Sequence, residues 1–588
     1  MRTDVPTARV EVQSAPIYTR LQSFTFVLIV FLGCACTHPI RASCQIQPDN
    51  PPSVVRGTVV NAVTHEPIGR ALVFSPDNRY ATLTDGEGHF EFTLPKVETD
   101  AGSSSSYLGQ PRQMWPTGAA GGLTWLLARK PGFVDDSNQR LRAELTPGNE
   151  LTISLTPEAL IKGRVTLSAA EPAHGVDVQL FFRQVQDGSF RWMQKNSVRT
   201  NSNGEFRFAE LEPGTYKVLT REWMDNDPIT AVPGGQLYGF PPVYYPSATD
   251  FVGAATIQLT PGQTFQADLS LVRQPYYPVK ITVSNAEQNG GMTITVSPQG
   301  QRGPGYSLGY NHATQTIEGQ LPNGKYLVEA SVYGPNSASG SVNIAVAGAP
   351  AEGPGMVVTR SNSIPVNVKE EFTSDNGFHS GSWSDGKQTF ALHGPRLDLD
   401  IRADPADDFE MGGGGSLRQP TGANDDSLVL ENLRSGRYWL RAHAHRGYIA
   451  SATMAGRDLL REPLVVVPGA STVIDILMRD DNAELEGTLL GIPTTPAGAN
   501  RLASPGYVYC LPLPDSPGQL FEFSASADGK FDYRVAPGFY RVFAFSSQQR
   551  DIPYRDAEAM KIYETKGQIV HFAPGQKVNL QLQVASGE

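Results

Sequence analysis

Two histidines one residue apart are the best candidates for metal binding in this sequence. Because side chains at positions i and i+2 of a strand share a face, His443 and His445 would point the same way and could share a cation. Trp439 and Arg441 would precede them on that face. The sequence offers no identifiable third ligand, so we expect a solvated strand face and assign no metal.

Another stretch matches a catalytic motif by its letters. Gly305-Tyr-Ser-Leu-Gly309 fits Gly-x-Ser-x-Gly, in which a sharp strand-to-helix turn exposes a nucleophilic serine, here Ser307. That motif needs a strand before it and a helix after it. The stretch lies instead in the Gly-rich sequence QGQRGPGYSLGY, so we expect a turn and no nucleophile.

Two short polar segments carry oxygen ligands of the kind that calcium prefers, Asp85-Gly-Glu-Gly88 and Asn201-Ser-Asn-Gly204. Neither segment continues to the bidentate glutamate of a twelve-residue EF-hand loop. Hairpin turns explain them better, because Asn/Asp-Gly supplies the positive φ of a tight turn. We therefore assign no calcium site.

Alternating aromatic residues raise the possibility of sugar binding. Phe190 and Trp192 would share a strand face, where their rings could stack on pyranose rings. Core packing is the alternative that we prefer, because alternating aromatic residues are typical of a sandwich interior. A sugar platform would need exposed rings, and the sequence does not decide whether Trp192, Trp223 or Trp439 is exposed.

The sequence contains no other pattern that is typical of a catalytic site. No cluster of Asp, Glu, His or Ser recurs at a spacing that suits catalysis. The ten histidines include neither His-x-x-Glu nor His-Glu-x-x-His, the patterns of zinc peptidases. We predict no catalytic residue, no cofactor and no enzyme activity.

Composition indicates several turn-rich domains. The 588 residues include 58 Gly and 45 Pro, and domains usually span about 100 to 200 residues. The net charge of −11 would repel a phosphate backbone, so we expect no nucleic-acid partner. The four cysteines are Cys34, Cys36, Cys44 and Cys510. Because three of them lie near the N-terminus, disulfide bonds cannot form a framework for the rest of the chain.

The N-terminus has the layout of an export signal. The apolar run FTFVLIVFL, from Phe24 to Leu32, follows three arginines and precedes small residues. It is too short to span a bilayer core of about 30 Å as a helix. We predict a signal peptide and leader over residues 1–44, export, and no membrane span in the mature chain. Lipid anchoring at Cys34 is an alternative that we do not favour.

A phrase of turn, alternating strand, second turn and alternating strand recurs about every 100 residues. After an Asn-Gly turn, Phe206 and Phe208 would face one side of a strand. After Pro213-Gly214, Tyr216 and Val218 would form another inward row. We expect these strands to form a meander in one antiparallel sheet. Similar phrases occur at 84–95, 317–330, 428–442 and 526–542.

Opening and closing phrases mark the limits of the units. Gly-containing strands open three of them, and strands that follow Pro-Gly close four of them. Helical periodicity is nearly absent, and we expect loops over Asp100–Gly122 and Asp404–Asp426. We predict an all-β chain of tandem antiparallel β-sandwich domains after the signal segment. The predicted domains are 50–158, 159–273, 274–361, 362–482 and 483–588.

Residues 54–92 resemble the carboxypeptidase regulatory-like domain. The family's Gly-x-Val step falls at Gly57 and Val59, and its Thr-Asp-x-x-Gly-x-Phe step runs from Thr84 to Phe90. The resemblance extends over nearly all of 54–586, although 274–361 lacks the Gly-x-Val opening. It implies prealbumin-like, seven-stranded sandwiches of a group called carbohydrate-binding-like, a label that describes shape and not function.

The leading functional hypothesis is a non-catalytic scaffold or binding protein that is extracellular, periplasmic or on the cell surface. Its repeats would hold a partner, which is a glycan or another envelope protein. The alternative is an array of carbohydrate-binding modules on the cell surface. The sequence does not indicate the oligomeric state.

Overall fold

The computed structural model describes residues 53–585, apart from gaps at 76–79, 95–124, 135–142, 145–149, 226–234, 285–290, 302, 333–336, 374–380, 385–388, 393, 408, 410–413, 423–424, 468–471, 492–505, 514–515, 517–518, 527, 547 and 550. The predicted signal segment, with Cys34, and the predicted loop at 100–122 lie outside the described residues.

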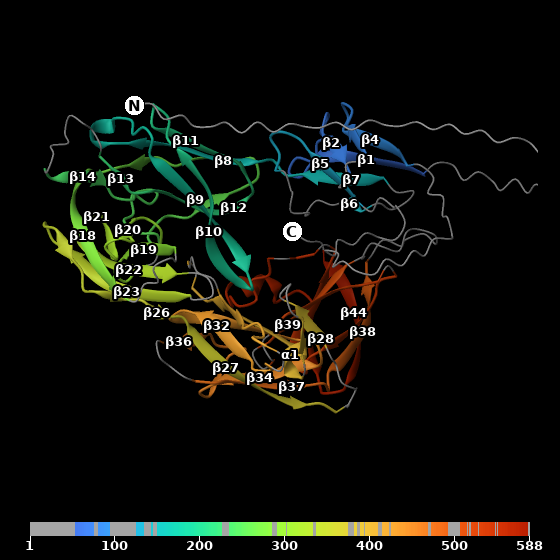
Figure 1. The fold of residues 1–588 in the computed structure, drawn as a ribbon. Helices are drawn as coiled ribbons and strands as arrows, with labels where there is room; N and C mark the ends of the chain where they lie inside the picture. The colour runs from blue at the N-terminus through green and yellow to red at the C-terminus, as the bar shows by residue number, and fades with distance from the viewer. Residues whose placement is uncertain are drawn as a thin grey trace, which may run out of the picture. The chain divides into compact units, whose positions relative to one another are not determined.

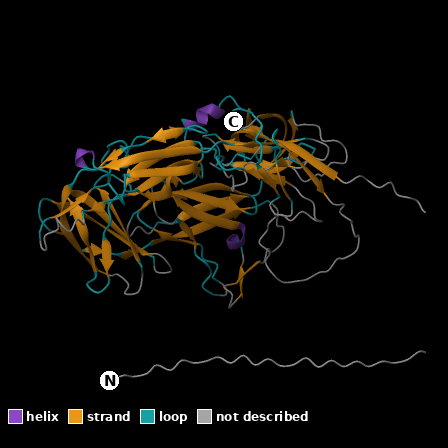
Figure 2. Cartoon of the chain, turned by 90° about the horizontal axis from the view of Figure 1, so that it is seen from above, coloured by secondary structure: helices purple, strands orange, loops and turns teal. Residues whose placement is uncertain are grey.

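The described chain consists almost entirely of strands and turns (Figures 1 and 2). Its helical parts are one turn, α1 (Pro395–Asp398), and two 3-10 turns at Ser168–Ala170 and Ala559–Tyr563. Within the described residues, no helix combines the length and the apolar character that crossing a membrane requires. The all-β prediction is confirmed.

We divide the strands into five segments. The first contains β1 (Ser53–Asn61), β2 (Leu72–Phe74), β3 (Ala81–Leu83), β4 (His89–Leu94), β5 (Trp125–Arg129), β6 (Ala143–Glu144) and β7 (Leu151–Leu155). Its two sheets have the orders β4-β1-β7 and β3-β2-β5-β6.

The second segment contains β8 (Ala159–Thr166), β9 (Asp177–Gln186), β10 (Ser189–Arg199), β11 (Glu205–Leu211), β12 (Gly214–Thr220), β13 (Trp223–Met224), β14 (Leu237–Phe240), β15 (Ile257–Leu259), β16 (Thr264–Gln266) and β17 (Leu269–Ser270). Its two sheets have the orders β10-β9-β12-β15 and β11-β8-β16, and β17 pairs with β8. Strands β13 and β14 join a sheet of the next segment.

The third segment contains β18 (Gln274–Ser284), β19 (Met292–Pro298), β20 (Gly309–Asn311), β21 (Thr316–Pro322), β22 (Gly324–Val332), β23 (Ala338–Val346), β24 (Ala351–Glu352), β25 (Met356–Val357) and β26 (Thr359–Arg360). Its sheets have the orders β13-β14-β18-β21-β20 and β19-β22-β23-β26. This segment therefore forms two sheets although it lacks the glycine opening.

The fourth segment contains β27 (Asn362–Glu371), β28 (Gly381–Ser384), β29 (Thr389–Leu392), β30 (Leu399–Pro405), β31 (Gly415–Leu417), β32 (Val429–Leu433), β33 (Gly436–Ala444), β34 (Tyr448–Met454), β35 (Arg457–Asp458), β36 (Leu464–Val466) and β37 (Ile474–Arg479). All except the β28-β29 pair form one continuous sheet, in the order β35-β34-β37-β27-β32-β31-β30-β33-β36.

The fifth segment contains β38 (Ala483–Leu490), β39 (Tyr507–Pro512), β40 (Phe521–Ser524), β41 (Lys530–Val535), β42 (Gly538–Phe545), β43 (Gln568–Phe572) and β44 (Lys577–Ala585). The strand order is β40-β39-β42-β44-β38-β41, and β43 pairs with β42.

Each segment has its own cluster of buried apolar side chains. The five clusters span residues 59–155, 159–271, 279–358, 364–478 and 483–582. In the first three segments the cluster takes side chains from both sheets, as a sandwich requires. The division into five folded domains with the limits given above stays a prediction.

The second segment corrects the expected meander. Phe206 and Phe208 of β11 are buried, and so are Tyr216 and Val218 of β12, as predicted. However, β11 pairs with β8, while β12 pairs with β9 and β15, so the two strands lie in different sheets. The chain crosses between the sheets at Gly214, which lets both rows of side chains enter one core from its two sides.

Parallel pairing is the second difference from a purely antiparallel sandwich. The opening strand of each segment pairs in parallel with a closing strand: β1 with β7, β8 with β16, β18 with β24, β27 with β37 and β38 with β44. The opening strand also pairs with an antiparallel neighbour, such as β4 beside β1. It therefore lies inside its sheet rather than at an edge.

A buried tyrosine follows the second turn in four segments, but its hydroxyl is not satisfied equally. The hydroxyl of Tyr216 donates to Glu212 O at 2.7 Å, and that of Tyr326 donates to Pro322 O at 3.0 Å. The hydroxyl of Tyr438 accepts from the backbone N–H of Arg434 at 3.2 Å. The hydroxyl of Tyr540 is buried and has no hydrogen-bond partner among the described residues.

We expect replacement of tyrosine by phenylalanine to have different effects on stability at Tyr216 and Tyr540. Tyr216→Phe removes a made hydrogen bond and should lower the free energy of unfolding by about 1 kcal/mol. Tyr540→Phe removes a buried hydroxyl without a described partner and should leave stability unchanged or raise it. Hydrogen exchange on peptides of each segment would measure both effects. An equal loss in the two variants would contradict this account.

Candidate functional site

The structure places the two histidines together without completing a metal site. His443 and His445 are exposed, and their ring centroids lie 5.1 Å apart at an interplanar angle of 83°. Among the described residues, no group of three His, Cys, Asp or Glu side chains is arranged to hold a metal ion. The solvated-face interpretation fits this geometry.

Ser307 does not lie on a nucleophile elbow. Only an isolated bridge at Tyr306 precedes it, and β20 follows it where the motif needs a helix. Its backbone N–H donates to Oε2 of Glu222 at 3.1 Å, and its hydroxyl oxygen is 3.5 Å from the same atom. Ser307, in the third segment, therefore anchors the carboxylate of Glu222 from the second segment.

The two candidate calcium segments are turns, but neither is a hairpin within one sheet. Asp85 Oδ1 accepts the N–H of His89 at 2.8 Å, and Asn201 Oδ1 accepts the N–H of Asn203 at 2.9 Å. The strands flanking each turn, β3 and β4 or β10 and β11, belong to different sheets. The turns therefore carry the chain from one sheet to the other.

The tryptophans named as possible sugar platforms are all half-buried. Trp192 packs against the ring of Phe251 at a centroid distance of 5.8 Å, in a cluster of apolar side chains. Trp223 stacks on Phe240 at 5.1 Å and 22°. The guanidinium of Arg555 lies 4.4 Å from the centre of the Trp439 ring. Trp192 is therefore packed as expected, but in a separate cluster on the outer face of its sheet and not in the sandwich interior. None of the three rings forms an open platform.

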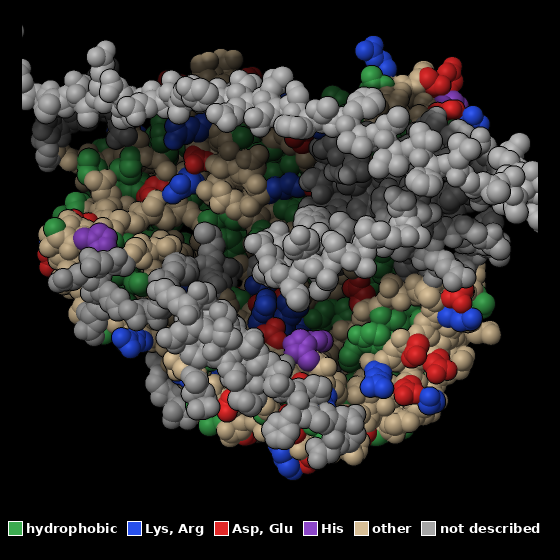
Figure 3. Space-filling view, turned by 45° about the vertical axis from the view of Figure 1, so that its right-hand side comes forward, with side chains coloured by type: hydrophobic (Ala, Val, Ile, Leu, Met, Phe, Trp, Pro, Cys, Tyr) green, Lys and Arg blue, Asp and Glu red, His purple; other side chains and the backbone are tan. Residues whose placement is uncertain are grey.

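Phe190 is likewise engaged, because the guanidinium of Arg183 lies 4.1 Å from its ring centre. Over the face drawn in Figure 3, basic and acidic side chains are interspersed rather than gathered by sign. On that face, therefore, no charged patch marks a candidate site.

A polar cavity of about 560 Å³ lies beside β30 and β31 in the fourth segment. Three guanidinium groups line it, those of Arg396, Arg402 and Arg418, together with the carboxylates of Asp400 and Asp404. The sequence drew no attention to these side chains, and two of them, Asp404 and Arg418, lie within the loop expected at 404–426. Alternation of apolar and polar residues along a single strand would not have identified them, because they come from α1, β30 and the residue after β31.

The loop prediction is wrong where β31 occupies Gly415–Leu417. A Cβ atom at Gly415 would approach the side chain of Leu433 and come within 2.8 Å of Glu431 O. Glycine is therefore needed here for close packing of β31 against β32. The last glycine of a run read as a loop signal is therefore the first residue of a strand.

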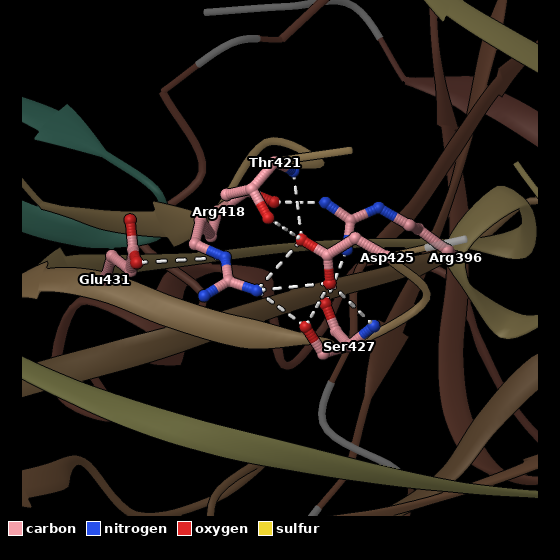
Figure 4. Close-up of polar contacts among 6 residues, drawn as sticks. All are labelled: Arg396, Arg418, Thr421, Asp425, Ser427 and Glu431. Atoms are coloured by element: carbon pink, nitrogen blue, oxygen red, sulfur yellow. Dashed lines mark hydrogen bonds and ion pairs between the residues drawn. The ribbon is translucent and has the colours of Figure 1, made fainter. Parts of the chain in front are cut away.

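Two of the arginines are fixed by hydrogen bonds, as Figure 4 shows. The guanidinium of Arg396 donates to the backbone carbonyls of Ser427 and Arg418. Arg418 Nη2 lies 3.1 Å from Asp425 Oδ2, and its Nε lies 4.0 Å from Glu431 Oε1. Arg418 Nε is buried without a hydrogen-bond partner among the described residues. One donor beside the cavity is thus left unmatched.

Asp425 organises the polar loop that holds Arg418. Its carboxylate accepts the hydroxyl of Ser427 and both the N–H and the hydroxyl of Thr421, at 2.9 and 2.7 Å for the last two. Hydrogen bonds from Ser427 and then from Thr421 hold the pKa of Asp425 well below its usual range. The carboxylate therefore stays ionised and keeps Arg418 in place.

Arg402, Asp400 and Asp404, the other charged residues of the cavity, differ in burial and in their ion-pair partners. Arg402 has an exposed side chain, and its Nε is 3.6 Å from Asp400 Oδ2. Asp404 Oδ2 lies 3.7 Å from Arg441 Nη1, while burial, followed by a hydrogen bond and repulsion from Asp187, raises the pKa of Asp404. The cavity thus combines two fixed guanidinium groups with a third that is accessible, an arrangement suited to a carboxylate.

Comparisons with known proteins find only distant structural similarities. No protein-family model matches the chain, and no curated protein matches it. The major pilin subunit of Bacillus cereus is 11% identical over 72% of this chain and 99% of its own, with a TM-score of 0.12. The minor pilin GBS52 of Streptococcus agalactiae is 12% identical over 38% and 97%, with a TM-score of 0.18.

A third solved structure, the RrgB pilus protein of Streptococcus pneumoniae, is 8% identical over 74% of this chain and 99% of its own, with a TM-score of 0.13. Such low scores carry no argument about function. The resemblance to carboxypeptidase regulatory-like domains likewise remains a prediction from residues. The functional proposal must therefore rest on the chain's own geometry.

Proposed function

We propose that this chain is a non-catalytic scaffold or binding protein, exported to the cell envelope or beyond, whose β-sandwich repeats hold a protein partner. The observation that carries the proposal is the series of five apolar clusters, each drawn from one segment. A chain built this way can present loops and cavities from rigid sheets. The arginine-lined cavity of the fourth segment is its candidate contact site.

The partner that best fits this cavity carries acidic groups. Arg396 and Arg418 are held in position before any partner arrives, so binding costs little further ordering of their side chains. Arg402 can then close on a carboxylate from the solvent side, in competition with Asp400. We therefore propose an acidic peptide segment of an envelope protein as the partner.

Two experiments test the proposal. Incubation with a broad panel of hydrolase substrates should give no turnover above background, and an enzyme-like rate on any substrate would refute the non-catalytic assignment. Fluorescence anisotropy with hexaglutamate, and with hexaglutamine as the uncharged comparison, tests the binding site. The acidic peptide should bind more tightly, and its affinity should fall as salt is added.

Arg402→Gln is the most direct variant of this site. Because Arg402 is exposed and donates to no backbone group of the described residues, its loss should weaken hexaglutamate binding about fivefold without unfolding the segment. Arg437→Gln is the matched control, since Arg437 is an exposed residue of β33 and does not line the cavity. Equal effects of the two variants would show that only overall charge matters.

A further inference from the structure

A second cavity, of about 330 Å³, lies over the outer face of the β19-β22-β23-β26 sheet. The other face of this sheet packs into the third core through side chains such as Val296, Val328 and Ile344. Since alternate side chains of a strand point to opposite faces, the cavity is lined by the intervening residues. These are mostly serine and threonine.

The register of the strands arranges these polar side chains in rows. Thr295 pairs with Glu329, and Glu329 pairs with Ser341, which gives one row across three strands. Ser331 pairs with Ser339 in the neighbouring row. Directly opposed side chains in such rows have Cβ atoms about 5 Å apart, close enough for adjacent groups to reach one ligand.

The side chains of the first row have no polar partner among the described residues. Thr295, Glu329 and Ser341 form no side-chain hydrogen bond or ion pair with another described residue, although all three line the cavity. A carboxylate between two hydroxyl groups can accept two hydrogen bonds while its neighbours both donate and accept. The row therefore presents unmatched polar groups to whatever fills the cavity.

The remaining wall supplies an apolar surface and balances the charge. Phe409 lines the cavity, and its ring is anchored at 5.1 Å from that of Phe251 and 5.7 Å from that of Phe181. Arg434 also lines it, so the lining contains one guanidinium and one carboxylate. A ligand with many hydroxyl groups, an apolar ring face and no net charge matches this combination.

We propose that this cavity binds a neutral saccharide, with Glu329 accepting hydrogen bonds from two sugar hydroxyls and Thr295 and Ser341 completing the row. An acidic sugar would be repelled by Glu329. The volume, at the lower end of the range of about 300 to 1,000 Å³ for small-ligand sites, suits one or two sugar rings.

A glycan array with the full chain, followed by calorimetric titration, tests the proposal. The probes for titration are glucose, galactose, N-acetylglucosamine, cellobiose and N,N′-diacetylchitobiose. We expect at least one neutral probe to bind, and Glu329→Gln to weaken it about tenfold, because hydrogen bonds to a charged acceptor are stronger than those to an amide. Ser341→Tyr, which fills the cavity from β23, should abolish binding.

Asn343→Tyr is the matched control, since Asn343 is the next residue on the same face of β23 and does not line the cavity. It should leave the affinity unchanged. A blank array, binding of acidic glycans alone, or binding that survives both Glu329→Gln and Ser341→Tyr would overturn the proposal. None of these outcomes depends on the acidic-peptide site, so either proposal can fail without the other.

Discussion

Gly163→Ala should lower the free energy of unfolding of the second segment by about 2 to 3 kcal/mol, the usual cost of forcing an extra methyl group into a packed core. A Cβ atom at Gly163 would overlap Ala267 O and come within 2.7 Å of the Phe206 ring. One obstacle is backbone, and the other is a buried aromatic ring. Neither can move aside without disturbing the core.

Gly309→Ala is the control for this prediction. Gly309 is also a strand glycine, but the atom nearest to its added Cβ would be Glu318 O at 3.8 Å. Its substitution should change stability by less than about 0.5 kcal/mol. Because a chain of several cores need not unfold in one step, hydrogen exchange on peptides of each segment is the appropriate measurement. Similar losses in both variants would refute the steric explanation.

The same packing explains why glycine recurs in the opening strands. Added Cβ atoms at Gly57 and Gly487 would also overlap a carbonyl oxygen of the parallel closing strand and a buried phenylalanine ring. Glycine is therefore required in the Gly-x-Val pattern because the opening strand, the parallel closing strand and a buried phenylalanine ring pack together at this position. The third segment lacks this pattern and accommodates other side chains along β18.

The second large effect should be a loss of stability as pH rises from about 4.5 to about 7. Burial raises the pKa of Glu222 from 4.5 to about 7, and the N–H of Ser307 offsets only part of this shift. Between these values the unfolded chain releases a proton that the folded chain retains, so the free energy of unfolding falls as pH rises. The total loss by pH 8 should be about 3 kcal/mol.

Glu222→Gln should remove this contribution. The stability difference between the variant and the parent protein should therefore grow in favour of the variant from pH 4.5 to pH 8, by about 3 kcal/mol. Chemical unfolding at a series of pH values, followed at the second and third segments, would measure it. Glu171→Gln, at an exposed carboxylate of the second segment, is the matched control. A difference that does not vary with pH would contradict the assignment.

In the second segment the sequence predicted which side chains point inward, because alternation reports directly on the two faces of a strand, whereas Tyr533 of the fifth segment, expected to face inward with Phe531, is exposed. Phe206, Phe208, Tyr216 and Val218 are all buried as expected. Alternation carries no information on which strand lies alongside, so the assignment of β11 and β12 to one sheet was wrong. Partner choice depends on how each turn directs the chain, and the same turn residues serve both a hairpin and a crossing.

The two cavities could not be predicted from the sequence. Arg396, Arg402 and Arg418 come from α1, β30 and the residue after β31, at spacings that match no motif. Thr295, Glu329 and Ser341 become neighbours only through the registers of β19, β22 and β23. The sequence does not show which polar residues of different strands become neighbours, because that depends on the register between the strands.

Parallel pairing of first and last strands has a mechanical meaning. In the β38–β44 pair the ladder runs from Glu484 beside Lys577 to Leu490 beside Gln583. Because these parallel strands lie near the two ends of the segment, tension along the chain pulls them past each other. The ladder is then loaded in shear, and its hydrogen bonds must break together instead of opening one by one. Such a segment resists stretching far better than a hairpin pulled apart from its open end.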